Sequence, residues 1–376
     1  MCPFWLNPVM PHCANYRFLT FPPRRRWKTH WQFIRLFIAC IVFTEAQAQP
    51  TTSPGATNRQ TSPAPSRTNS TVRASVTPTS TTKPQLTIDS FPRLPSDTLE
   101  AQIALARQVF SSGSIDGVTG PQTRAALIAF QRAWVLNPTG GLDAATRDAL
   151  MLESPPMATY IITSNDLARL QPLSKTWLGK SQQTALDYEN VLELVAERGH
   201  ASPNLIRRLN PTVDWTNVVA GAEVKIPEVE YPAPSTKAAF VWISLAERKL
   251  QAFDANTNLL AHFPCSIAAK FEKRPVGELH VSAIAPNPDY TFNPEVFPES
   301  EEARQMTTKL ILPPGPNNPV GTAWISLDRP GYGMHGTPNP EQVGRTESHG
   351  CFRLANWNAD YLLKLVWVGM PVFVEP

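Results

Sequence analysis

The chain has 376 residues, 38 prolines and a net charge of +3, and this length allows two or three domains rather than one. The basic excess lies at the N-terminus: residues 1–48 hold six Lys/Arg and one Glu, whereas residues 49–376 hold 28 basic and 30 acidic side chains, a net of −2. This balance excludes a strongly basic nucleic-acid-binding surface after residue 48, so we expect no nucleic-acid partner.

The first segment, residues 1–48, has the pattern of a secretory signal. Arg24–Lys28 forms a basic flank, Leu36–Phe43 is a short apolar run, and Ala46-Gln47-Ala48 is a small-x-small cleavage site. Because the run is short for a transmembrane helix, we predict cleavage after Ala48 and export to the periplasm or cell envelope. An uncleaved signal anchor is the alternative, and the residues ahead of the basic flank suggest an over-extended start.

Residues 49–95 form a linker rich in serine, threonine and proline. The linker has few large apolar side chains, so it cannot bury enough surface to offset the entropy lost on ordering. We therefore predict a disordered spacer.

Residues 96–152 have helical periodicity and predict a small three-helix bundle. Asp97 is placed to cap the first helix, Pro121 to begin the second and Asp143 to cap the third. The stretch from Ile115 to Gln131, with its Asp-Gly and Gly-Pro-Gln-Thr-Arg elements, resembles the peptidoglycan-binding-like domain. That resemblance implies binding to peptidoglycan; a bundle that serves only as a spacer is the alternative.

Residues 157–229 predict a strand, two helices and a closing strand. The pattern resembles the lysin motif (LysM), most closely from Leu205 to Pro227, and this resemblance implies binding to glycans that contain N-acetylglucosamine. About twenty-four residues, 167–190, are inserted where the first LysM helix should begin. A packing role against the next domain is the alternative.

Residues 237–376 predict a mostly β, sandwich-like domain, which makes the whole chain a multidomain α+β protein. Long loops are expected between 284 and 322. Strands are expected near 239–243, 249–253, 259–267, 278–283, 323–327 and 372–374, and helices near 301–306 and 358–366.

Two cysteines follow the leader, Cys265 and Cys351. In an exported chain a disulfide between them is the ordinary expectation, and a catalytic thiol at Cys351 is the alternative. A nucleophilic cysteine needs a base or a positive field to form its thiolate. His335, sixteen residues earlier and followed by the small Gly336, is the candidate base, and the adjacent His349 is its rival.

The residues around Cys351 suit acyl transfer. The backbone N–H groups of Gly350 and Cys351 could stabilise an oxyanion, and Arg353 adds a positive charge that could hold a substrate carboxylate or brace the loop. His200, His262 and His280 have no partners at suggestive spacing, and no set of His, Asp and Glu residues has zinc-ligand spacing, so we expect neither a metal nor a cofactor.

His335-Gly336-Thr337 followed by Ser348-His349-Gly350-Cys351-Phe352-Arg353-Leu354 resembles the catalytic motif of the L,D-transpeptidases. The resemblance implies that Cys351 is the nucleophile, that His335 is the base, and that the Gly336 carbonyl orients it. It also implies that Ser348, His349, Gly350 and Arg353 shape the site. Thr337, Tyr290 and Asn356 are expected to bind substrate, with Asn356 displaced by one residue from the family pattern.

The resemblance implies a reaction in cell-wall peptidoglycan. Cys351 would form a thioester with a stem tetrapeptide and release D-alanine, and an amine of a neighbouring diaminopimelate would complete a 3→3 cross-link. Water as acceptor would give a carboxypeptidase, and a protein lysine would give an anchoring enzyme. Carbapenem-type β-lactams are the expected covalent inhibitors. Two other classes remain open: a wall-binding protein without activity, and a cysteine hydrolase that cleaves cross-links.

Overall fold

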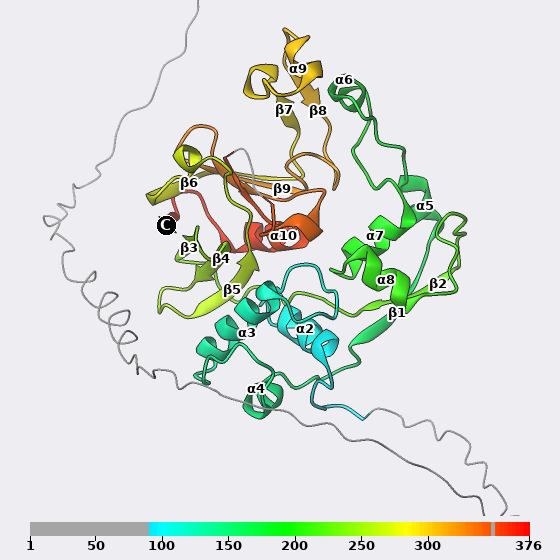
Figure 1. Cartoon of the computed structure of the whole chain (residues 1–376), viewed down its shortest axis with the longest axis vertical. Helices are drawn as coiled ribbons and strands as arrows, with labels where there is room; N and C mark the ends of the chain where they lie inside the picture. Colours follow the sequence, from blue (N-terminus) through cyan, green and yellow to red (C-terminus); the bar gives the residue numbers. More distant parts are fainter. Residues whose placement is uncertain (1–89, 347–349) are drawn as a thin grey trace, which may run out of the picture. The chain divides into compact units, whose positions relative to one another are not determined.

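The computed structural model of the chain describes residues 90–346 and 350–376, so the predicted leader and almost all of the linker lie outside it. We refer to residues 90–152 as the helical region, 157–229 as the middle region and 237–376 as the C-terminal region (Figure 1). The α-helices are α2 (Thr98–Arg107), α3 (Pro121–Ala133), α4 (Ala144–Ala149), α5 (Ser164–Arg169), α6 (Trp177–Ser181), α7 (Val191–Arg198), α8 (Pro203–Leu209), α9 (Glu301–Arg304) and α10 (Asn356–Leu365). The strands are β1 (Met157–Ile161), β2 (Glu223–Pro227), β3 (Phe240–Ser244), β4 (Lys249–Phe253), β5 (Leu259–Pro264), β6 (Gly277–Pro286), β7 (Tyr290–Phe292), β8 (Leu310–Leu312), β9 (Ala323–Leu327), β10 (Gly333–His335), β11 (Phe352–Arg353) and β12 (Pro371–Glu375). Three short 3₁₀ turns are η1 (Phe271–Lys273), η2 (Pro294–Val296) and η3 (Pro340–Gln342).

The helices of the helical region begin at the capping residues that the sequence contains. The Asp97 carboxylate accepts from the backbone N–H of Glu100, and Pro121 occupies the first turn of α3, where a missing N–H costs nothing. The apolar faces meet around Phe130, which is fully buried and packs edge-on against Phe110 at a centroid distance of 5.5 Å. Burial of one such phenylalanine contributes roughly 1.5–3 kcal/mol.

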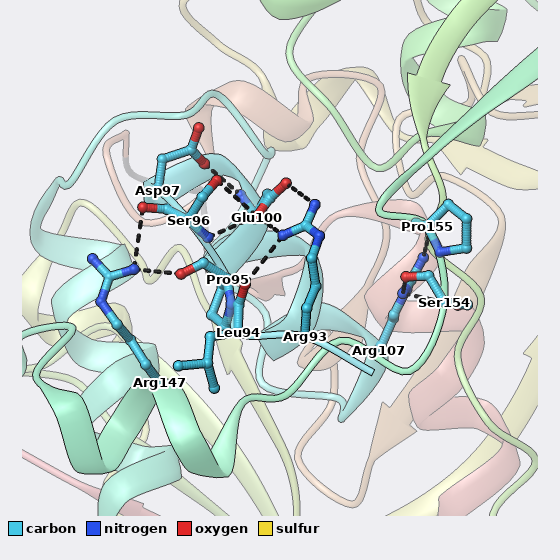
Figure 2. A network of polar contacts seen from close by, with 10 residues as sticks. All are labelled: Arg93, Leu94, Pro95, Ser96, Asp97, Glu100, Arg107, Arg147, Ser154 and Pro155. Atoms are coloured by element: carbon cyan, nitrogen blue, oxygen red, sulfur yellow. Dashed lines mark hydrogen bonds and ion pairs between the residues drawn. The ribbon is translucent and has the colours of Figure 1, made fainter. Parts of the chain in front are cut away.

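Arginine side chains form hydrogen bonds and ion pairs at the ends of the helical region (Figure 2). Arg93 makes a bidentate ion pair with Glu100, with N–O distances of 2.6 and 2.7 Å. Arg147 donates to the carbonyl oxygens of Pro95 and Ser96. Arg107 donates to carbonyl oxygens of Ser154 and Pro155, and to that of Glu228 at 2.9 Å, and so joins the helical region to the connection ahead of the middle region and to the end of that region.

In the middle region β1 and β2 pair antiparallel, and α7 and α8 pack beside them around a core that includes Ile162, Leu194 and Ile206. Four helices, α5 to α8, lie between β1 and β2 instead of the two expected, and the inserted residues contain the end of α5 and the whole of α6. The likeness to a lysin motif stays a prediction.

The C-terminal region is built on one eight-stranded sheet in the order β11-β10-β9-β6-β12-β3-β4-β5. The pairing of β6 with β9 contains a bulge between Val281 and Ala283, just beyond the residues of β6 that pair with β12, and such bulges bend a strand. Helix α10 packs against β9, β10 and β6 (Figure 1). The prediction of mixed helix and sheet with a largely β C-terminal region is confirmed.

The outer edge of β5 is covered by the chain that follows α2. The backbone of His262 accepts from Ser111 at 2.9 Å and donates to Val109 at 3.0 Å, and the Val109 side chain is buried in the core of the C-terminal region. The exposed hydrogen-bonding edge of a sheet is a hazard for aggregation, and this short segment pairs with it.

Residues 288–316, which we call the hairpin arm, were expected to be loop with one helix. The helix is present as α9, but β7 and β8 also pair antiparallel over three residues each. Phe292 and Leu312 of this pair are fully buried in a small separate core that includes Leu186 of the middle region. This pairing was not predicted because each strand is too short for a period-two pattern.

No helix within the described parts of the chain has the length and apolar content needed to cross a membrane.

Candidate active site

Two short parallel strands bring together the residues of the proposed chemistry. In the register of β10 and β11, Met334 lies opposite Phe352 and His335 opposite Arg353. Met334 and Phe352 are buried in the core. Because side chains alternate along a strand, His335 and Arg353 project from the other face. Cys351 lies immediately before β11, two residues ahead of Arg353.

The His335 ring is held in one orientation. Its Nδ1 lies 2.6 Å from the carbonyl oxygen of Gly336. A carbonyl can only accept, so Nδ1 carries the proton and Nε2 keeps its lone pair. The ring also stacks on Trp324, with centroids 5.5 Å apart. This is the contact that the resemblance implies for Gly336.

Burial keeps His335 neutral. The imidazole is buried, and loss of solvation lowers its pKa to about 4, with the Arg353 charge acting in the same direction and the Gly336 carbonyl opposing. A neutral imidazole with an unprotonated Nε2 can accept a proton at physiological pH.

Cys351 is half-buried, and its Sγ lies 3.5 Å from the carbonyl oxygen of Gly331. Burial raises the pKa of its thiol to about 11, against the lowering effects of the Gly333 backbone and of Arg353. Cys351 is therefore a thiol at rest. Cys265 lies buried in the core of the sheet, and its sulfur is not bonded to that of Cys351. The prediction of a disulfide between Cys265 and Cys351 is therefore wrong.

Arg353 and Tyr290 face the cysteine from two different elements. The Arg353 backbone pairs with Ser266 through two hydrogen bonds of 2.9 and 3.0 Å, which fixes the end of β11. Burial lowers the pKa of its guanidinium, and the neighbouring Cys351 and Tyr290 counteract this. Burial and the proximity of Cys351 raise the pKa of Tyr290 to about 12. Tyr290 thus stays a hydroxyl that can donate a hydrogen bond.

A cavity of about 470 Å³ opens beside these residues. Tyr290 of β7 and Trp324 of β9 form part of its wall, and Trp324 is the ring that stacks on His335. The remaining lining residues are Ala285, Pro288, Asp289, Thr291 and Val320.

The side chains of Asn356 and Thr337 are buried at the turn that follows His335. The Asn356 side chain is buried, its Oδ1 accepts from the Thr337 N–H at 2.9 Å, and its Nδ2 donates to the Pro316 carbonyl. Thr337 is also buried, and its hydroxyl accepts from the Asn339 N–H. These hydrogen bonds brace the turn after His335, and substrate binding by Asn356 and Thr337 stays a prediction.

Close contacts explain why that turn contains glycine. A Cβ on Gly336 would lie 2.2 Å from Asn356 Oδ1, so any larger residue would displace the amide. The Glu197 carboxyl of α7 lies behind the same amide, where burial raises its pKa to about 8 and Asn356 opposes the shift. The middle region therefore contacts, through Glu197, the Asn356 amide that holds the turn after His335.

Three further residues were expected to shape the site: Ser348, His349 and Gly350. Gly350 is half-buried and lies next to the Tyr332 ring. Ser348 and the rival base His349 lie outside the described residues. The roles of Gly350, Ser348 and His349 in shaping the site stay predictions.

The three remaining described histidines have local partners. His262 is buried beside Gln251, and His200 stacks on Trp357 with centroids 5.0 Å apart. His280 lies near two carboxylates, 3.0 Å from Asp328 and 3.3 Å from Glu278.

Sequence reasoning missed Trp324 as a residue of the site. The signal available for it was its outward position in the alternating strand 323–327.

Comparison with known proteins points to the same family that the motif around Cys351 resembles. Residues 238–374 match the family described as "L,D-transpeptidase catalytic domain", and residues 95–150 match "Putative peptidoglycan binding domain". The chain is 25% identical over 185 residues to "Putative L,D-transpeptidase YkuD" of Bacillus licheniformis, which covers 49% of this chain and 93% of that protein. It is 29% identical over 208 residues to "Probable L,D-transpeptidase ErfK/SrfK" of Salmonella typhimurium, which covers 54% of this chain and 66% of that protein.

Among solved structures, the chain is similar to L,D-transpeptidase 3 from Mycobacterium tuberculosis. The sequence identity is 16% and the TM-score 0.30, over 43% of this chain and 77% of the other.

Proposed function

We propose that this chain, whose residues 238–374 match the L,D-transpeptidase catalytic domain, forms 3→3 cross-links in peptidoglycan by cysteine acyl transfer. The observation that carries the proposal is the pair of neighbouring strands β10 and β11. His335 ends β10 and Cys351 immediately precedes β11, with the histidine oriented by the Gly336 carbonyl.

The first half-reaction forms a thioester. Cys351 Sγ attacks the carbonyl between diaminopimelate and the terminal D-alanine of a tetrapeptide stem, and His335 Nε2 takes the thiol proton. Because both groups are neutral at rest, the proton moves as the substrate arrives, and no thiolate is stored beforehand. The tetrahedral intermediate collapses, the C–N bond breaks, and the imidazolium returns the proton to the departing amine of D-alanine.

The second half-reaction reverses these roles. The side-chain amine of a neighbouring diaminopimelate attacks the thioester carbonyl, His335 accepts a proton from it, and the thiol is regenerated with its proton. Backbone N–H groups at Gly350 and Cys351 are the proposed oxyanion donors. Arg353 is the proposed partner of a substrate carboxylate, since a guanidinium matches that group in charge and geometry. Neither half-reaction needs a nucleotide or a metal, because the cleaved peptide bond supplies the acyl group.

The remaining regions suit a polymeric substrate. The helical region is proposed to bind peptidoglycan, as its match over residues 95–150 suggests. Export to the periplasm or cell envelope, through a signal peptide in residues 1–48, would place the enzyme where that polymer lies. Its product would contribute to cell-wall organisation and cell shape.

Incubation of the purified chain with disaccharide tetrapeptide tests the proposal. We expect release of D-alanine and a cross-linked dimer, seen by mass spectrometry, and loss of both with Cys351→Ala. Cys265→Ala is the matched control, since it removes the other described cysteine without touching the site. Dimer formation by Cys351→Ala would refute the proposal. Tripeptide without dimer would indicate a carboxypeptidase, and cleavage of a supplied dimer would indicate a cross-link hydrolase.

Reaction with a carbapenem identifies the nucleophile directly. A thiol that opens the β-lactam ring becomes acylated and gains the mass of the drug. We expect this adduct on the intact chain and on Cys265→Ala, and its loss on Cys351→Ala. A chain that neither gains the adduct nor forms product, yet sediments with cell-wall sacculi, would be a wall-binding protein without activity.

A further inference from the structure

We infer that residues 171–187, which we name the clamp segment, are a positioning element of the active site: through Trp177 they hold the hairpin arm so that Tyr290 faces Cys351. This inference rests on the proposed function for its meaning in catalysis. Its structural content, that one region of the chain fixes the arm of another, stands on contacts alone.

An aromatic stack forms the centre of the clamp. Trp177 of α6 lies on Phe292 of β7, with ring centroids 4.2 Å apart and planes 15° apart, and also contacts Phe297 at 5.8 Å. Phe292 is fully buried. An aromatic pair of this kind contributes about 0.5–1.5 kcal/mol beyond the burial of its area.

A carboxylate of the hairpin arm fixes the start of α6. The two oxygens of Glu302 accept from the backbone N–H groups of Trp177 and Leu178, at 2.9 and 3.0 Å. Charge-assisted bonds to backbone donors are stronger than neutral ones. The contact therefore ties Trp177 to α9 as well as to β7.

The end of the clamp segment is bonded to the end of the hairpin arm. The Leu186 N–H donates to Pro314, and the Leu186 carbonyl accepts from the Asn317 N–H, both at 2.9 Å. A Cβ at Gly315 would lie 2.2 Å from the Leu186 carbonyl oxygen, and Gly315 has a φ of +141°. Only glycine permits this approach, so the arm contains the residue that the clamp requires.

The hairpin arm needs such support. The strands β7 and β8 pair over only three residues, and an isolated two-stranded hairpin is marginal in water. The core of the arm is completed by clamp residues, among them Leu173, Trp177 and Leu186. Without these residues the arm would lose much of its buried surface.

The clamped strand contributes to the active site. Tyr290 is two residues before Phe292 on β7 and lines the 470 Å³ cavity together with Trp324. Trp324 stacks on His335. A shift of β7 would therefore change the shape of the cavity next to the histidine, whereas β10 and β11 belong to the main sheet and would stay in place.

Hydrogen–deuterium exchange in the full chain tests the structural part. We expect Trp177→Ala to raise exchange roughly tenfold across residues 290–312 and to leave β3, β4 and β12 unchanged, because local opening is controlled by local contacts. Trp177→Phe should restore protection. Leu178→Ala is the matched control, since it alters the exposed neighbour and leaves the backbone N–H in place.

Kinetics on the tetrapeptide donor test the catalytic part. We expect Trp177→Ala to lower kcat/KM roughly tenfold to a hundredfold, mostly through KM, because a misplaced binding wall costs rate and affinity. The carbapenem adduct at Cys351 should still form on the variant. Glu302→Gln should act in the same direction, with the exposed Glu301→Gln as control, and it serves if Trp177→Ala fails to fold.

Each result has one meaning. Unchanged exchange in residues 290–312 overturns the clamp. Raised exchange with kcat/KM within about twofold of the unaltered chain overturns its role in positioning Tyr290. Failure of the unaltered chain to release D-alanine would refute the proposed function, while the exchange experiment would still decide whether the clamp exists.

Discussion

The Nδ1 atom of His335 lies 2.6 Å from the carbonyl oxygen of Gly336, and this one hydrogen bond leaves Nε2 as the basic nitrogen of the ring. The bond is made to the next residue of the same chain segment. Among the described residues, the base is therefore oriented by a backbone carbonyl and not by a carboxylate, which would have raised its pKa. The low pKa of about 4 is consistent with this arrangement.

The first prediction concerns thiol reactivity. With a pKa near 11, the fraction of Cys351 present as thiolate should rise about tenfold per pH unit between pH 7 and 9. Alkylation by iodoacetamide in the absence of substrate should rise in parallel, followed by mass spectrometry on Cys265→Ala. A plateau below pH 8 would contradict a neutral resting pair and indicate a preformed thiolate.

The second prediction concerns the base. His335→Gln removes the proton acceptor, so D-alanine release should fall about 10²–10⁴-fold. Thermal unfolding should show that the fold is retained. His280→Gln, at an exposed histidine between two carboxylates, is the control and should keep full activity. In the unaltered enzyme, activity should decline as pH falls through about 4, because protonation of Nε2 then removes the base.

The third prediction concerns the brace behind His335. Asn356→Ala would leave the buried N–H of Thr337 without its acceptor, which should cost about 1–3 kcal/mol in the free energy of unfolding. Activity should also fall, since the turn that carries the Gly336 carbonyl would loosen. Urea unfolding and D-alanine release measure the two effects. Asn339→Ala, in the same turn but exposed, should change neither the free energy of unfolding nor D-alanine release. Equal effects of the two variants would contradict the bracing role of Asn356.

The fourth prediction concerns Glu100. Its hydrogen bonds with Arg93 lower the carboxyl pKa to about 2, from 4.5 in an unstructured chain. A lowered pKa in the folded state stabilises the protein above about pH 4.5, and this stabilisation is lost as pH falls from 4.5 toward 2. Glu100→Gln should therefore reduce the urea midpoint at pH 7, and the difference should shrink between pH 4.5 and 3. Asp148→Asn, at an exposed residue of α4, should show no such convergence.

Sequence reasoning located those elements whose pattern is local. Strands β3, β4 and β9 lie within one residue of their expected ranges, and the caps Asp97 and Asp143 precede their helices directly. The site strands β10 and β11 have three and two residues. They are too short for any periodicity, so no strand was predicted there, and only the catalytic motif marked this stretch as functional.

The parts that could not be predicted depend on distant partners. The inserted residues 167–190 were recognised as a departure from a lysin motif, but Trp177 bonds to Glu302, 125 residues later. Asn356 had the residue type of a substrate ligand, and only its burial shows that it braces the chain. Local sequence does not encode which distant surface a segment will meet.

The pairing of Val109 and Ser111 with β5 has a practical consequence for anyone who dissects this protein. A shortened chain that begins near residue 237 would leave the edge of β5 open and the place of the Val109 side chain empty. Such a fragment should self-associate through that strand. The smallest well-behaved unit should therefore start ahead of α2, however self-contained the last 140 or so residues look when they are counted by family match alone.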